Sequence, residues 1–132
     1  MSERATSILM IVGGGLFALV GLTLLALGRD VVLAWGLITF FGAVALVGTT
    51  GVLPGRGLGP LVWPVAGLMA GAGCGILAYL GITDPSEFRT SRYPPEVLIP
   101  VTLAGALFFG VGGLIVLILM LRNRRALESD DD

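Results

Sequence analysis

Four long stretches of the chain contain no charged residue. They cover residues 5–28, 31–55, 57–83 and 97–121, which are 24, 25, 27 and 25 residues long. The hydrocarbon core of a bilayer is about 30 Å thick, and a helix needs about 20 residues to cross it. The pattern therefore predicts four transmembrane helices, at about residues 7–28, 31–53, 60–82 and 96–121.

The faces of these stretches distinguish a membrane protein from a soluble bundle. Surface helices of a soluble protein carry a polar stripe at helical spacing. Residues 8–27 are apolar or glycine apart from Thr23, and residues 97–121 are apolar or glycine apart from Thr102. Charged residues make up 13% of the 132-residue chain, against about 25% in soluble globular proteins. The sequence therefore predicts an all-α integral membrane bundle, one domain at 1–125.

Breaks in the apolar pattern predict how the helices connect. Only Gly28, Arg29 and Asp30 separate the first two stretches, and one helix over 5–55 would be about 75 Å long, more than twice the bilayer core. The chain must turn back here. We therefore expect two antiparallel hairpins, divided by the proline- and glycine-rich segment 54–60. The glycine- and alanine-rich third span has a re-entrant loop as its alternative.

The longest connection, residues 84–96, contains a helix start. In this start, Asp84 is the N-cap, Pro85 takes the first helical position, and Glu87 is the acidic residue three positions after the cap. We expect a short interfacial helix near 85–92 that lays Phe88 toward the membrane surface. Arginine and tyrosine are enriched at binding hot spots, so the loop is a candidate partner surface, with Glu87, Phe88, Arg89, Arg92 and Tyr93.

The arginines predict the orientation. With four spans, five arginines fall on the side of the termini and three on the other side, and basic residues concentrate on the cytoplasmic side. We expect both termini in the cytoplasm, in the cell membrane or a bacterial inner membrane. Arg122, Arg124 and Arg125 would act as topology anchor and bind anionic lipid. Residues 126–132 resemble an acidic disordered tail.

The first span also resembles a secretory signal peptide in outline. Both have a basic start and an apolar core followed by small residues, such as Ala26-Leu27-Gly28. A signal peptide's core is usually about 7–15 residues, whereas this one runs to about 20. A retained transmembrane helix is therefore the better interpretation.

Small residues recur at helical spacing on three spans. Because lipid tails are as apolar as leucine, close backbone approach drives helix association in membranes, and small residues permit it. The spacing predicts packing inside the bundle, with contact to another subunit as the alternative interpretation. The candidate helix-packing residues are Gly14, Gly21, Gly67, Gly71, Gly75, Ala106, Gly110 and Gly113.

The residue types argue against catalysis. The chain has no histidine and one cysteine, Cys74, so it lacks the commonest general base and cannot build a thiolate metal site or a histidine-ligated haem. The four stretches also lack the charged groups that usually run ion-coupled transport. We expect no enzyme activity, no cofactor and no nucleic-acid partner.

Two functions remain. The first is a small membrane protein acting by contact, as an accessory subunit of a membrane complex, a homo-oligomer or a membrane immunity-type protein. The alternative is an oligomeric channel or small-solute transporter lined by threonines. One internal similarity, Phe40-Phe41-Gly42 in the second span and Phe108-Phe109-Gly110 in the fourth, suggests a repeated hairpin, although the first and third spans do not repeat.

Overall fold

A computed structural model describes residues 2–52, 59–88 and 94–130, except for the side chains of Glu87 and Asp130. The described residues form helices and turns, with no strand among them. Their order is α1 (Glu3–Ala26), α2 (Val31–Gly36), η1 (Leu37–Phe41), α3 (Gly42–Gly48), η2 (Thr49–Gly51), α4 (Gly59–Thr83), η3 (Pro85–Phe88), α5 (Pro95–Gly105), η4 (Ala106–Val111) and α6 (Gly112–Asp130).

Four helical runs are long and apolar enough to cross a membrane. They are Glu3–Ala26, Val31–Gly51, Gly59–Thr83 and Pro95–Ser129. We call the run Val31–Gly51, made of α2, η1, α3 and η2, the second span. The run made of α5, η4 and α6 is the fourth span. The predicted all-helical fold, with four helices long and apolar enough to span a membrane, is therefore confirmed for the described residues.

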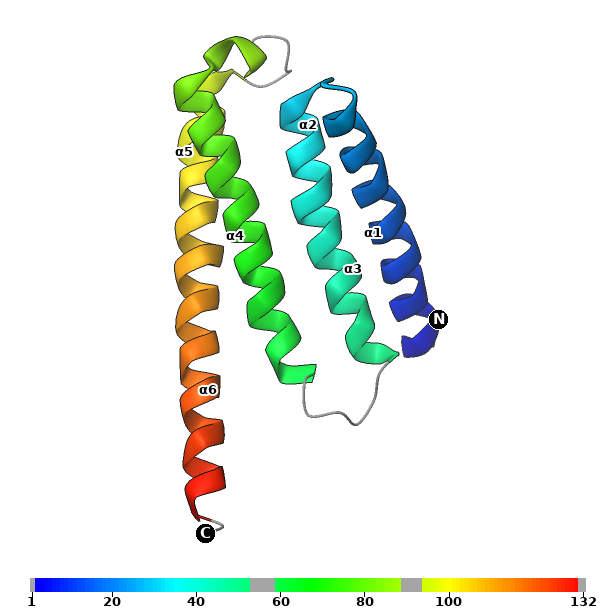
Figure 1. Ribbon diagram of the computed structural model, residues 1–132, viewed down its shortest axis with the longest axis vertical. Coiled ribbons are helices and arrows are strands. Elements are labelled where there is room, and N and C mark those ends of the chain that lie inside the picture. The colour runs from blue at the N-terminus through cyan, green and yellow to red at the C-terminus, as the bar shows by residue number, and fades with distance from the viewer. Residues whose placement is uncertain (1, 53–58, 89–93, 131–132) are drawn as a thin grey trace.

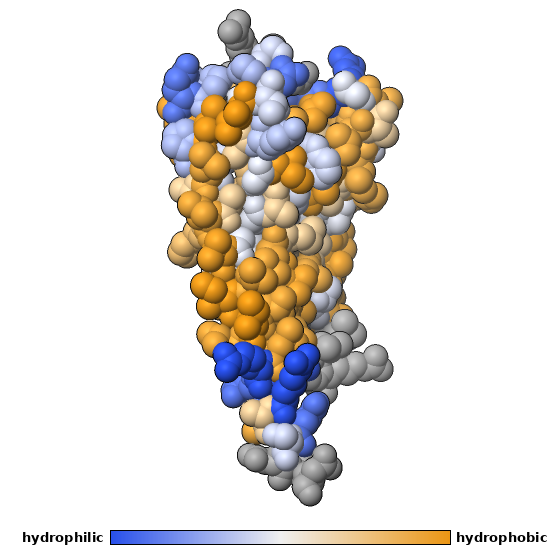
Figure 2. Space-filling view, turned by 60° about the vertical axis from the view of Figure 1, so that its left-hand side comes forward, coloured by the Kyte–Doolittle hydropathy of each residue, from blue (hydrophilic) through white to orange (hydrophobic). Residues whose placement is uncertain are grey.

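The spans lie side by side in chain order (Figure 1). The first helix, α1, packs along α2, η1 and α3, and α4 packs against both the second and the fourth spans. The two chain ends lie at the same end of the structure, where α4 also begins. Figure 2 shows a broad hydrophobic surface between hydrophilic groups at either end, as a bilayer-spanning protein requires.

The turn between α1 and α2 is fixed by local hydrogen bonds. Gly28 has a φ of 62°, and its N–H donates to the Leu25 carbonyl at 3.1 Å while the Arg29 N–H donates to the Leu24 carbonyl at 2.9 Å. This is a Schellman motif, which favours glycine at the left-handed position. Asp30, with a φ of 43°, then caps α2 by accepting from the Leu33 N–H at 3.1 Å.

Two short segments of the spans are π-helical, η1 in the second span and η4 in the fourth. The first contains Phe40 and Phe41, and the second contains Phe108, Phe109 and Gly110. The repeated sequence therefore coincides with a repeated local distortion. Single-turn π-helices are rare and frequently occur at functional sites.

Two segments differ from the sequence-based expectation. The expected helix near 85–92 is described only over η3, a 3₁₀ turn, and residues 89–93 lie outside the described residues. The expected disordered tail at 126–132 is wrong for its first part, since α6 continues to Asp130. Arg-Arg-Ala-Leu-Glu at 124–128 consists of good helix formers, which explains why the helix outlasts the apolar span.

Candidate functional site: an apolar groove lined by all four spans

Glycines bring α1 against the second span. A Cβ atom built on Gly14 would lie 2.6 Å from the Phe41 carbonyl oxygen, and one built on Gly21 would lie 2.8 Å from the Ala34 carbonyl oxygen. Real Cβ atoms do not approach backbone this closely, so both positions require glycine for this packing. Gly48, on the second span, meets Met10 of α1 in the same way at 2.9 Å.

A matching contact joins α4 to the fourth span. A Cβ built on Gly71 would lie 2.6 Å from the Cα of Gly110, and one built on Gly113 would lie 3.1 Å from the Pro64 carbonyl oxygen. Gly67 is looser, with the Phe109 carbonyl oxygen 3.6 Å away. Ala106 is half-buried. The two helix pairs thus share one kind of contact. Gly14 of α1 faces the backbone of Phe41 in the second span, and Gly71 of α4 faces the backbone of Gly110 in the fourth.

Gly75 differs from the other candidate packing glycines. A Cβ built there would meet nothing within 4 Å. Two helix residues that are four positions apart point in directions that differ by about 40° around the helix axis. Gly67, Gly71 and Gly75 therefore cannot all face one straight neighbouring helix. Gly75 has therefore turned away from the contact that Gly71 makes.

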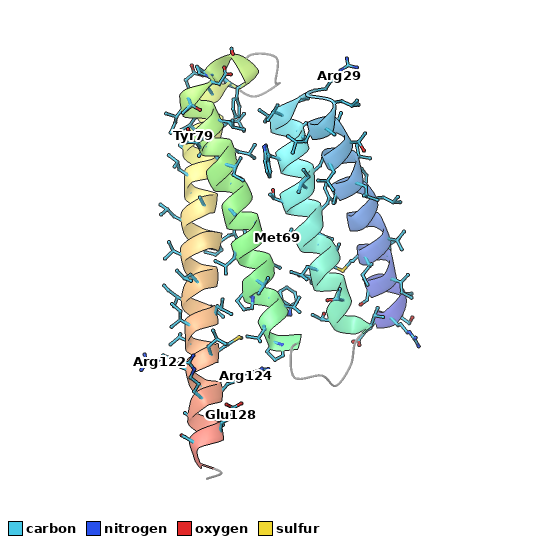
Figure 3. The ribbon with its side chains drawn as sticks, in the orientation of Figure 1. Arg29, Met69, Tyr79, Arg122, Arg124 and Glu128 are labelled. Carbon is cyan, nitrogen blue, oxygen red and sulfur yellow. The ribbon has the colours of Figure 1, made fainter. Side chains whose placement is uncertain are left out.

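The contact between the two helix pairs uses residues outside the predicted set. A Cβ built on Gly73 would lie 2.8 Å from the Thr39 methyl carbon, and one built on Gly42 would lie 2.6 Å from the terminal methyl of Met69. Figure 3 shows Met69 between α4 and the second span. The only sequence signal for Gly73 and Gly42 is that each is a glycine within a span.

An apolar groove of about 690 Å³ opens beside this contact. Every span contributes to its wall. Its lining residues are Met10 of α1; Gly36, Thr39, Phe40, Ala43, Val44 and Val47 of the second span; Trp63, Ala66, Gly67, Ala70, Cys74 and Leu77 of α4; and Phe109 of η4. Both π-helical segments take part, η1 through Thr39 and Phe40 and η4 through Phe109.

The groove offers almost no free polar group. The Thr39 hydroxyl donates to the Trp35 carbonyl of its own helix at 2.7 Å. The other threonines considered as channel lining also bond to their own spans: Thr23 to Leu19, Thr49 to Leu46, Thr50 to Val47, and Thr102 to Leu98. Such back-bonding satisfies the hydroxyl donor locally, so each of these donors is used within its own helix.

A second, shallower groove lies between α4 and the fourth span. It has a volume of about 540 Å³ and shares Trp63, Gly67 and Phe109 with the first groove. Its remaining lining residues are Pro64, Leu107, Phe108, Gly112, Gly113 and Val116. Trp63, whose side chain is 62% exposed, thus stands where the two grooves meet.

Phe88 corrects the expected partner surface. It is 1% exposed, the most deeply buried large side chain among the described residues, and its ring lies 3.6 Å from a Cβ built on Gly81. A binding hot spot must be accessible, so Phe88 does not belong to a partner surface. It ties the end of α4 to η3 instead. Arg89, Arg92 and Tyr93, and the side chain of Glu87, lie outside the described residues.

The three arginines near the C-terminus differ in their surroundings. Arg122 and Arg125 are exposed, whereas Arg124 is half-buried. Figure 3 shows Arg122 and Arg124 on opposite sides of α6, with Arg124 on the side of the other helices. Arg124 follows Gly113 by eleven residues, about three helical turns, so both lie on the face of α6 that α4 meets at Gly113.

Known proteins provide no direct guide to this site. No protein-family model matches the chain, and searches of curated proteins and of solved structures found no similar protein. Within 2–52, 59–88 and 94–130, no three His, Cys, Asp or Glu residues gather as a metal site would require. The arrangement described above is a set of apolar contacts and grooves.

Proposed function

We propose that this chain is a non-enzymatic, multi-pass protein of the cell membrane that acts by contact. It serves as an accessory subunit of a larger membrane complex or as a membrane immunity-type protein. The observation that carries the proposal is the backbone contact of Gly14 with Phe41 and of Gly71 with Gly110. At these contacts the backbones of neighbouring helices meet with no room for a side chain, which supports a role in which the protein acts through its shape.

In this proposal the chain forms two antiparallel hairpins with both termini in the cytoplasm. Five of the eight arginines then fall on the cytoplasmic side. The connection between α4 and α5 faces outward, where the proposed interfacial helix continues beyond η3. The buried Phe88 ring supports this role because it holds the start of the connection against α4.

The partner surface proposed for this connection consists of Arg89, Arg92 and Tyr93. Anchoring by Phe88 would restrict the conformations of the residues that follow it. A restricted loop loses less entropy on binding. Phe88 then supports the recognition residues without touching the partner.

The alternative of an oligomeric channel or small-solute transporter receives less support. A hydrated path needs unpaired polar groups along its wall, and Thr23, Thr39 and Thr102 instead bond to carbonyls of their own helices. Ionic current from the purified protein in a planar bilayer would favour this alternative over the contact function.

Purification from native membranes in mild detergent, followed by mass spectrometry, tests the proposal. The wild-type chain is expected to retain a specific membrane protein. Joint replacement of Arg89, Arg92 and Tyr93 with alanine, leaving Phe88 in place, is expected to release it. Arg29→Ala, at the turn on the same side, is the matched control and should retain the partner. Retention by the triple variant would move the interface to a helix face.

A further inference from the structure

Two kinds of glycine contact hold the four spans together. We call α1 and the second span the first helix pair, and α4 and the fourth span the second helix pair. Within each pair, glycines meet backbone atoms. A Cβ built on Gly14 lies 2.6 Å from the Phe41 carbonyl oxygen, and one built on Gly71 lies 2.6 Å from the Gly110 Cα. Backbone atoms cannot rotate away as the end of a side chain can, so each pair forms a stiff unit.

The described glycines that join the two pairs meet side chains instead. A Cβ built on Gly42 lies 2.6 Å from the terminal methyl of Met69, and methionine adapts its conformation easily, so this contact is compliant. A Cβ built on Gly73 lies 2.8 Å from the Thr39 methyl carbon. Thr39 is β-branched and its hydroxyl donates to the Trp35 carbonyl at 2.7 Å, which fixes its rotamer. At these glycines, the pairs therefore meet through one firm contact and one compliant contact.

The firm contact lies partway along both helices that make it. Thr39 is eight residues from the start of the second span and twelve from its end on the side of the chain termini. Gly73 is ten residues from Thr83 and fourteen from the start of α4. At 1.5 Å per residue, the arms on the side of the termini are about 18 Å and 21 Å long, and the opposite arms are about 12 Å and 15 Å long. The contact therefore has the position of a pivot.

The larger groove extends to both sides of this pivot. Its wall includes Thr39 and continues to Val47 and Trp63 toward the termini, and to Gly36 and Leu77 away from them. Lipid tails are as apolar as leucine, so they replace protein atoms at little cost where the pairs move apart. Separating the helices of one pair would instead break close-packed backbone contacts. Tilting one pair against the other is therefore the easier movement.

We propose that the two helix pairs rock against each other about Thr39 and Gly73, and that this movement widens and narrows the groove. A tilt that opens the groove on the side of the termini closes it on the opposite side. A rotation of about 10° would move the end of the second span, about 18 Å from the pivot, by about 3 Å. Met69 follows the movement by changing rotamer. This inference does not depend on the protein partner proposed above.

Distances between spin labels on the two pairs test the proposal. In a Cys74→Ala background, Leu9→Cys on α1 and Leu119→Cys on α6 report the separation of the pairs on the side of the termini, and both positions are exposed. Leu9→Cys with Leu33→Cys, and Tyr79→Cys with Leu119→Cys, are controls that each lie within one pair. Double electron–electron resonance in lipid bilayers is expected to give a broader distance distribution between the pairs than in either control.

A bulky side chain in the groove tests the direction of the movement. Leu22→Cys with Val101→Cys reports the separation on the side away from the termini. Ala70→Phe, in the groove wall on the termini side of the pivot, should lengthen the termini-side distance by about 3 Å, as a tilt of about 10° requires, and shorten the opposite one. Val44→Phe, on the facing wall, should do the same. Ala72→Phe, at an exposed position of α4, should change neither distance.

Two substitutions of Thr39 test the pivot itself. Thr39→Ala removes the firm contact and should narrow the distribution between the pairs, because the two helices then meet along a longer stretch. Thr39→Val keeps the shape of the side chain and should match the wild type. A wild-type distribution as narrow as the controls would show one rigid body, and equally broad controls would place the movement within the pairs. Lengthening of both distances in Ala70→Phe and Val44→Phe would mean separation rather than rocking, and no change in either would contradict a movement coupled to the groove.

Discussion

Gly71 and Gly110 bring the backbones of α4 and η4 together so closely that a methyl group on Gly71 would lie 2.6 Å from the Gly110 Cα. Gly75, one turn further along α4, faces open space. The two glycines therefore form a matched pair for testing whether backbone contact holds the second half of the chain together.

Gly71→Ala should destabilise the protein by about 1–3 kcal/mol, the usual cost of overpacking. Gly75→Ala should be neutral or stabilising by up to about 1 kcal/mol, because alanine favours helix more than glycine does. Thermal unfolding in detergent, with monodispersity followed by size-exclusion chromatography, measures both. Similar effects of the two substitutions would show that the contact with Gly110 does not stabilise the fold.

Phe88→Ala should cost about 3–5 kcal/mol, the range for truncating a buried phenylalanine. Phe108, which is 74% exposed, is the control, and Phe108→Ala should have little effect on unfolding. Limited proteolysis of the connection between α4 and α5 gives a second readout. Cleavage after residue 88 should accelerate in Phe88→Ala alone; unchanged cleavage would argue against the anchoring role.

At the first turn, Gly28→Ala and Asp30→Ala should each destabilise by about 1 kcal/mol. The first forces a side chain into left-handed backbone, and the second removes the hydrogen bond to Leu33 that caps α2. Asp30→Asn keeps both the cap and the tolerance for this conformation and should be close to wild type. If Asp30→Asn loses as much as Asp30→Ala, the carboxylate charge matters and the capping explanation fails.

The orientation can be tested by labelling single cysteines in a Cys74→Ala background. Ser91→Cys should react with an impermeant maleimide in intact cells, and Ser129→Cys should react only after lysis. The reason is the excess of arginine on the side of the termini. The opposite pattern would place the termini outside, and labelling of both in intact cells would be incompatible with an even number of spans.

The sequence predicts the four helices because charge has a high cost in hydrocarbon. Arg29 and Asp30 cannot stay in the bilayer core, so the end of α1 near residue 28 follows from two side chains. Which glycines touch a neighbouring helix depends on the angle and position at which the two helices cross. The spacing of glycines along the sequence does not give that crossing geometry. Gly75 shares the four-residue period of Gly71 yet faces away, while Gly73 breaks that period and meets Thr39.

The connection and the C-terminus show where local signals mislead. Phe88 follows a polar helix start among charged residues, so the sequence places it in an interfacial loop; only the proximity of Gly81 reveals a pocket that accepts its ring. At the C-terminus, acidic residues suggest a solvated tail, although the helix propensity of 124–128 is sufficient to extend α6 to Asp130.

The Schellman turn at Gly28 also bears on how the protein enters the bilayer during synthesis. Its hydrogen bonds join residues no more than five apart, so it can form before any later span has left the ribosome. Chains fold from the N-terminus as they are made. The first two helices can thus insert as a preassembled pair, offering the glycine- and alanine-rich α4 a protein surface, at Thr39 and Gly42, rather than lipid alone.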